Sequence, residues 1–270
     1  MMTSTLSFTS CLLYFAATVL TLRTLRGTSS SRQPGPFDLL LVYLAVIAHG
    51  LSLTPMLVLS GTPNLALGTT LSLITLLVTL LFLVARLFQP IHTLGVFIYP
   101  TAFAGALVGW LLPGPAYASS LGGTLGFLHM AGAGLAYALV SLAFAQALLL
   151  QAYDRSLKEA QTVSSWRSLP PIQTMERVLF QLVYIGFALL TVTLISGALS
   201  AGRMFGDALL FNHHTVLALL AWVSLAGLIA GRGLLGWRGQ TAVLWTGAGF
   251  TLMALGYFGS RFVLEVLLNR

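Results

Sequence analysis

The stretch "TLGFLHMAGAGLAYALVSLAFAQALLL", residues 124–150, decides the class of fold. It contains no Asp, Glu, Lys or Arg, and it exceeds the roughly 20 helical residues that cross the hydrocarbon core of a bilayer. Its apolar residues do not alternate with polar ones, as they would in strands of a lipid-embedded barrel. Because lipid offers the backbone no hydrogen-bond partners, this run predicts a membrane-spanning helix.

The composition of the whole chain agrees with this reading. Of the 270 residues, 57% are hydrophobic and only 7% are charged, whereas soluble domains carry about 25% charged residues. We predict an all-α, polytopic membrane helix bundle that forms one integral membrane domain over residues 1–270, with a cytoplasmic linker at about 151–177. About eight apolar runs are long enough to be transmembrane helices, near residues 5–22, 37–59, 68–88, 92–112, 124–150, 174–198, 211–231 and 241–267.

The formal net charge of +7 reports topology rather than a nucleic-acid partner. If the N-terminus lies outside the cytoplasm, ten of the thirteen basic residues fall in cytoplasmic segments: Arg23, Arg26, Arg32, Arg86, Arg155, Lys158, Arg167, Arg177, Arg232 and Arg238. Cytoplasmic loops of membrane proteins carry this excess of Lys and Arg. We therefore expect a multi-pass protein of the bacterial inner (plasma) membrane with both termini periplasmic and no nucleic-acid partner.

Three histidines lie near the outer ends of predicted spans. His129 is in the second turn of the run 124–150, while His213 and His214 begin the run 211–231. At a rise of about 1.5 Å per residue all three can share one depth, and two imidazoles on different helices can ligate one haem iron from opposite faces. Adjacent residues point about 100° apart on a helix, so only one of the pair can face such a site. Spacing alone also allows each ring simply to form hydrogen bonds at the interface.

Two further residues, His49 and Arg261, have two readings each. His49, in "AHGLSL", lies deep in the second span and is either a ligand of an inner cofactor or a hydrogen-bond partner of a neighbouring helix. Arg261 can grip a haem propionate with its planar guanidinium, or it can form a surface pair with Glu265 four residues on. Glu176 is predicted to cap the helix that it begins.

Several motifs resemble the cytochrome c assembly protein family of the CcsA/CcmC type. The run that opens at His129 resembles the family helix that begins with a histidine and continues into small and aromatic residues. The segments "GWRG" at 236–239 and "YFGSRFV" at 257–263 look closest to the YpjD/HemX-like branch, supported by "AHGLSL" and "TMERVLF". The resemblance covers nearly the whole chain.

The resemblance implies haem handling. It predicts an inner-membrane protein of cytochrome c assembly, not itself an enzyme, that binds haem b near the periplasmic face and works with other cytochrome c maturation proteins. His129 and His213 would be the axial ligands of the haem iron, with His49 and Arg261 as further haem-binding residues. The segment 198–212 lacks the tryptophans that haem-presenting members carry in front of the seventh helix. Haem binding is therefore expected without the surface that presents haem to an apocytochrome.

Two other classes of function stay open at the level of sequence. One is a transporter of a small solute or an ion, and the other is a structural subunit of a membrane complex. Hard cations prefer oxygen ligands, and the acidic residues Asp38 and Glu265 lie at the ends of predicted spans rather than inside them. The ion-pathway reading therefore has few ligands to use.

The charge distribution generates a test of topology. An alkaline phosphatase domain fused after Arg270 should be active, because the positive-inside rule places the C-terminus in the periplasm. A fluorescent reporter that works only in the cytoplasm should be dark at the same position. An inactive phosphatase together with a bright reporter would show that the C-terminus is cytoplasmic and that the predicted topology is wrong.

Overall fold

The computed structural model describes residues 2–26, 35–55, 57, 64–114, 124–159, 169–205, 213–263 and 267. Within these residues the regular elements are helices, and no strand occurs. The principal helices are α1 (Met2–Arg26), α2 (Pro36–Thr54), α3 (Leu67–Phe88), α4 (Gly95–Leu111), α5 (Thr124–Lys158), α6 (Ile172–Phe205), α7 (His213–Leu235) and α8 (Gly239–Ala254). Three short elements are η2 (His92–Leu94), the π-helical turn η4 (Leu255–Gly259) and α9 (Ser260–Phe262).

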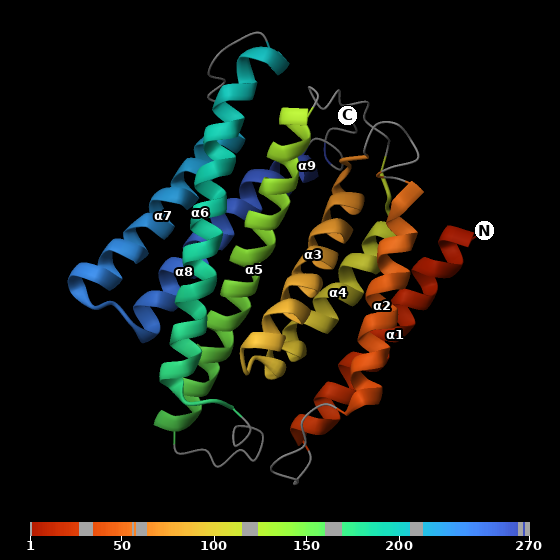
Figure 1. Cartoon of the computed structure of the whole chain (residues 1–270), viewed down its shortest axis with the longest axis horizontal. Coiled ribbons are helices and arrows are strands. Elements are labelled where there is room, and N and C mark those ends of the chain that lie inside the picture. Colours follow the sequence, from red (N-terminus) through yellow and green to blue (C-terminus); the bar gives the residue numbers. More distant parts are fainter. Residues whose placement is uncertain are drawn as a thin grey trace. The chain divides into compact units, whose positions relative to one another are not determined.

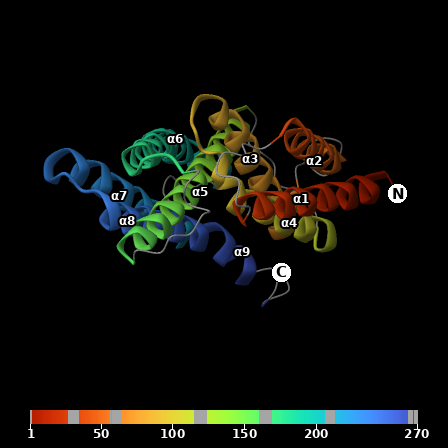
Figure 2. The same cartoon turned by 90° about the horizontal axis from the view of Figure 1, so that it is seen from below.

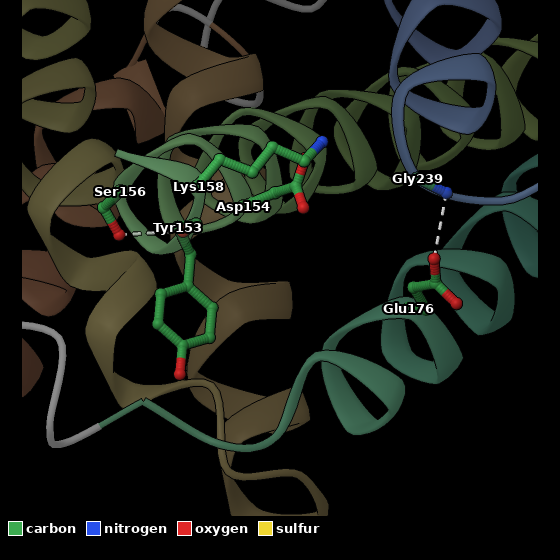
Figure 3. A network of polar contacts seen from close by, with 6 residues as sticks. All are labelled: Tyr153, Asp154, Ser156, Lys158, Glu176 and Gly239. Carbon is green, nitrogen blue, oxygen red and sulfur yellow. Dashed lines mark hydrogen bonds and ion pairs between the residues drawn. The ribbon is translucent and has the colours of Figure 1, made fainter. Parts of the chain in front are cut away.

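In the described part of the chain, eight helices are long and apolar enough to cross a membrane. They cover Met2–Thr24, Pro36–Thr54, Leu67–Phe88, His92–Leu111, Gly126–Lys158, Ile172–Leu199, His213–Leu235 and Gly239–Phe262. The predicted all-α bundle of about eight spans is thus confirmed. Helix α5 extends beyond its apolar run into the segment predicted as a linker, where the Lys158 ammonium lies 2.6 Å from the Asp154 carboxylate one turn before it (Figure 3).

The chain divides into two compact units, which are described separately. Residues 1–117 and 149–175 form the first unit, in which α1 packs on α2 and α4, and α3 packs on α4 (Figures 1 and 2). Two glycines of α4, Gly105 and Gly109, rest on Thr75 and Ser72 of α3, where a Cβ atom would overlap the partner side chain. Small residues four apart bring these two helices into close contact. That the whole chain is a single domain stays a prediction.

Residues 118–148 and 176–270 form the second unit, which contains most of α5 and α6 together with α7 and α8. The indole N–H of Trp222 in α7 donates to the hydroxyl of Thr191 in α6 at 2.8 Å. Phe144 of α5 stacks on Phe250 of α8 with ring centroids 4.5 Å apart. Aromatic contacts and side-chain hydrogen bonds therefore link these helices, as expected in lipid, where van der Waals packing rather than water exclusion drives association.

The turn between α7 and α8 is fixed by a carboxylate from α6. Gly236 and Gly239 adopt left-handed backbone conformations, with φ of 67° and 53°, that suit glycine. The buried Glu176 accepts the backbone N–H of Gly239 at 2.9 Å (Figure 3). Glu176 therefore caps the first residue of α8, whereas the sequence pointed to a cap of its own helix.

This contact predicts the effect of two matched substitutions. Glu176→Gln should lower the free energy of unfolding by roughly 1–2 kcal/mol, because a neutral amide replaces a charge-assisted acceptor at a helix N-terminus. Asp154→Asn, which breaks a partly exposed ion pair, should cost less than about 0.5 kcal/mol. Circular dichroism of both variants during denaturation in micelles measures the difference. Equal losses of unfolding free energy in the two variants would show that the Glu176 contact stabilises the fold no more than a partly exposed ion pair does.

Candidate functional site

His129 is held from one side by helix α6. Its Nδ1 atom lies 3.1 Å from the carbonyl oxygen of Thr193 and 3.1 Å from the hydroxyl oxygen of Ser196. Its ring lies against Gly197, where an added Cβ would come within 2.9 Å of the ring atom Cε1. Residues spaced by three and four lie on one face of a helix. That face of α6 therefore offers both a hydrogen-bond partner and room for the imidazole.

These contacts fix which ring nitrogen of His129 carries the proton. A carbonyl oxygen can only accept a hydrogen bond, so Nδ1 must be the donor to Thr193. The Ser196 hydroxyl gives its own proton to the same carbonyl oxygen, at 3.0 Å. A neutral imidazole carries one N–H, so Nε2 retains its lone pair. No described residue forms a hydrogen bond with Nε2 of His129, whose printed contacts are all made through Nδ1.

His214, in the first turn of α7, has the same arrangement. Its Nδ1 lies 3.0 Å from the carbonyl oxygen of Gly256, which again makes Nδ1 the donor and leaves the lone pair on Nε2. Its ring meets Tyr257 edge-on, with centroids 6.2 Å apart. His214 also lies within electrostatic range of His129. Two imidazoles from different helices of the second unit thus share this arrangement, each with Nδ1 on a backbone carbonyl oxygen.

A π-helical turn supplies the carbonyl that holds His214. In η4 the backbone hydrogen bonds span five residues instead of four, a departure that occurs often at functional sites. Gly256 lies in this turn, and the hydroxyl of Ser260 also donates to its carbonyl oxygen. A Cβ at Gly256 would lie 3.3 Å from Cβ of Leu217 in α7. The glycine therefore allows α7 to approach closely enough for His214 to reach the backbone.

His213 is differently placed. Its side chain is exposed at the first position of α7 and forms no hydrogen bond with the described part of the chain. Because consecutive helical residues point about 100° apart, the contact of His214 with Gly256 turns His213 in another direction. Its role as the second ligand stays a prediction that the contacts do not favour.

His49 belongs to the first unit and has both ring nitrogens engaged. It is only 1% exposed. Its Nε2 lies 2.8 Å from the hydroxyl of Ser72 in α3, and its Nδ1 lies 3.4 Å from the hydroxyl of Tyr14 in α1. The structure thus shows His49 bound to neighbouring helices, one of the two readings of the sequence. A role as ligand of a cofactor stays a prediction and would require replacing one of these bonds.

Arg261 is half-buried in α9, directly after the π-helical turn that holds His214. It follows Gly256 by five residues along the chain. Glu265, its alternative partner from the sequence, lies outside the described residues. A contact between Arg261 and a haem propionate stays a prediction.

Sequence reasoning did not identify the residues that support the two rings. Thr193, Ser196 and Gly197 on α6 carry a readable signal, because small polar residues recur at three and four positions in an apolar helix. Tyr137 was also not identified from the sequence, and its buried hydroxyl has no hydrogen-bond partner among the described residues. Its ring packs edge-on against Phe258 of η4, with centroids 5.5 Å apart.

The donor set restricts which metal centre could form. No group of three or more His, Cys, Asp or Glu side chains in the described ranges could hold a metal ion. Zinc sites in proteins take at least three protein ligands. Haem needs only one or two axial ligands, because the porphyrin supplies the other four nitrogens. Two imidazoles with free Nε2 atoms therefore suit haem iron.

Comparison with known proteins assigns the family. The profile described as "Cytochrome C assembly protein" matches residues 39–268. The chain belongs to the cytochrome c assembly protein family. The matched range contains all five histidines of the chain, and the match confirms the resemblance seen in the sequence.

Two relatives indicate the membrane in which this cytochrome c assembly protein lies and the process in which it takes part. It is 30% identical over 232 residues to the inner membrane protein YpjD of Escherichia coli (strain K12), covering 83% of this chain and 85% of that protein. It is 27% identical over 106 residues to the cytochrome c biogenesis protein CcsA of Nostoc punctiforme, covering 37% of this chain and 30% of that protein. No solved structure matches the chain at a significant level. It is thus a multi-pass inner-membrane protein with a role in cytochrome c biogenesis.

Proposed function

We propose that this cytochrome c assembly protein binds and positions haem b between His129 and a histidine at the start of α7. Family membership gives the broad role, but a fold can host many functions, so the site must carry the specific claim. The single observation that carries it is the pairing of both Nδ1 atoms with backbone carbonyl oxygens, at 3.1 Å from Thr193 and 3.0 Å from Gly256.

This pairing is the usual support of a histidine that ligates a metal. Such a histidine donates its other ring N–H to a carbonyl or carboxylate, which fixes the tautomer, holds the ring in place and makes the ligating nitrogen more basic. His129 and His214 both have this support. Nothing has to rotate or lose a proton before Nε2 can bind.

The contacts favour His214 over His213 as the second axial ligand. Both side chains are exposed at the start of α7, but His214 has a carbonyl partner, whereas His213 forms no hydrogen bond with a described residue. The family resemblance had pointed to His213. Because the two residues are adjacent, they form a matched pair for testing the choice.

Other side chains of the second unit would complete the site. Arg261 is the proposed partner of a propionate, since its guanidinium can grip a carboxylate with two parallel hydrogen bonds. Tyr137 offers a buried hydroxyl that has no partner in the described structure, and a buried polar group without a partner is costly. Haem b would supply an iron that takes two axial nitrogens. The protein itself would hold the two imidazoles, exclude water with its aromatic residues and catalyse no reaction.

The rival functions lack comparable support. An ion pathway requires oxygen ligands inside the membrane, but the described carboxylates in the spans are engaged near helix ends. Asp38 accepts the N–H of Gly35 at the start of α2, and Asp154 pairs with Lys158 at the end of α5. A purely structural subunit would bind other maturation proteins without haem. The visible spectrum of the purified protein distinguishes such a subunit from a haem-binding protein.

The proposal predicts the spectra of three histidine variants. Wild-type protein purified from haem-replete cells should show the sharp bands of a low-spin, six-coordinate haem b that acidic acetone extracts. His129→Ala and His214→Ala should each lose most of the bound haem, because one axial ligand is removed. His213→Ala is the matched control and should retain wild-type haem content.

Optical spectra and haem assay per polypeptide distinguish the outcomes. Loss of haem in His213→Ala but not in His214→Ala would restore the choice suggested by the resemblance and refute the assignment made from contacts. A wild-type protein without a Soret band would contradict haem binding and favour the structural-subunit reading. Monodisperse gel filtration of each variant shows that the loss is not due to unfolding.

A further inference from the structure

The first helix, α1, lies before the range that the family model matches, which begins at residue 39. Within the first unit it packs on α2 and α4 (Figures 1 and 2). Residues three or four apart share one face of a helix, and the buried face of α1 follows this spacing with Ser10, Cys11, Tyr14 and Ala17. The contacts of this face show what holds α1 on the part of the chain that matches the family.

Tyr14 makes a polar contact from that face to α2. Its side chain is fully buried. Its hydroxyl lies 3.4 Å from Nδ1 of His49, and the two rings meet edge-on with centroids 5.7 Å apart. A second ring contact, of Phe15 with Phe103 of α4, is apolar and has a centroid distance of 6.0 Å. Hydrogen bonds between helices join apolar packing in holding a bundle together in lipid.

The other ring nitrogen of His49 faces α3. Its Nε2 lies 2.8 Å from the hydroxyl of Ser72, and the residue is 1% exposed. Ser72 in turn meets α4 at Gly109, where an added Cβ would come within 2.5 Å of the Ser72 Cβ. One imidazole therefore joins α1, α2 and α3, and α4 is packed closely behind the partner of Nε2.

This packing differs from what a ligand of haem iron needs. A metal lies about 2 Å from the imidazole nitrogen that binds it, and the porphyrin plane requires open space at that point. On the Nδ1 side, the hydroxyl and ring edge of Tyr14 occupy the space. On the Nε2 side, Ser72 and α4 occupy it. Iron at either nitrogen would require α1 or α3 to move away.

We propose that His49 is the docking point of α1: Tyr14 and Ser72 hold its two ring nitrogens, and the imidazole joins three helices instead of ligating a cofactor. A polar group inside the membrane is costly unless it has a partner in the protein. Separation of α1 would remove the partner of Nδ1 of His49. Docking of α1 and hydrogen bonding of this nitrogen are therefore one event.

Cys11, the one cysteine of the chain, is a built-in probe of this docking. It lies one turn before Tyr14 on the same buried face and is 5% exposed. Labelling of its thiol by N-ethylmaleimide therefore requires α1 to open. When opening and closing are fast relative to labelling, the labelling rate follows the population of the open state. Mass spectra of the intact protein, taken during the reaction in micelles, measure this rate.

Tyr14→Phe should raise the labelling rate about threefold, as the loss of a typical hydrogen bond between membrane helices would. His49→Leu should raise it about tenfold, because the Tyr14 hydroxyl then faces an apolar side chain. Tyr43→Phe is the matched control: it makes the same chemical change at a tyrosine of α2 that is 42% exposed, and it should label as wild type. Equal rates in Tyr14→Phe and Tyr43→Phe would overturn the proposal.

Haem content separates a docking point from a ligand, and this second measurement rests on the proposed function. His49→Leu purified from haem-replete cells should retain the wild-type amount of haem per polypeptide and a wild-type Soret band. Loss of haem in His49→Leu together with wild-type labelling of Cys11 would make His49 a ligand and overturn the proposal. Wild-type protein without haem would contradict the proposed function alone, because the labelling rates do not depend on haem.

Discussion

A backbone carbonyl oxygen can only accept a hydrogen bond, and this constraint governs the candidate site. It forces Nδ1 of His129 and of His214 to carry the proton and leaves both Nε2 atoms with their lone pairs. The surrounding features serve these two contacts. Gly197 makes room for one ring, and the π-helical turn at 255–259 exposes the carbonyl that meets the other. The site is therefore prepared by backbone geometry more than by side-chain chemistry.

The membrane explains where polar groups are found in this chain. Lipid offers no hydrogen bonds, so a polar side chain in a span must find a partner in the protein or lie near an interface. His49, in the interior of the first unit, has a hydroxyl at each ring nitrogen. His129 and His214 lie near the starts of their helices. The candidate ligands His129 and His214 thus lie near helix ends, whereas both ring nitrogens of the interior His49 are in hydrogen bonds.

The sequence was sufficient for the spans because hydropathy reflects the bilayer directly. It predicted eight helices and placed His129 and the pair at 213–214 at helix ends. It could not choose between His213 and His214, because that choice depends on the rotation of α7 against a π-helical turn. The partner of Glu176 was equally hidden, since Gly239 lies 63 residues away along the chain. The extension of α5 to Lys158 was missed because hydropathy detects apolar runs and not a polar helical end with an ion pair between Asp154 and Lys158.

Both imidazoles are preset with a proton on Nδ1 and a lone pair on Nε2. Nitrogen-15 NMR of haem-free protein labelled at histidine measures this directly, because protonated and unprotonated ring nitrogens resonate in separate ranges. Loss of a signal pair in His129→Gln and in His214→Gln assigns the resonances. The account predicts protonated Nδ1 and unprotonated Nε2 at both residues. A proton on Nε2 of either neutral ring would contradict it.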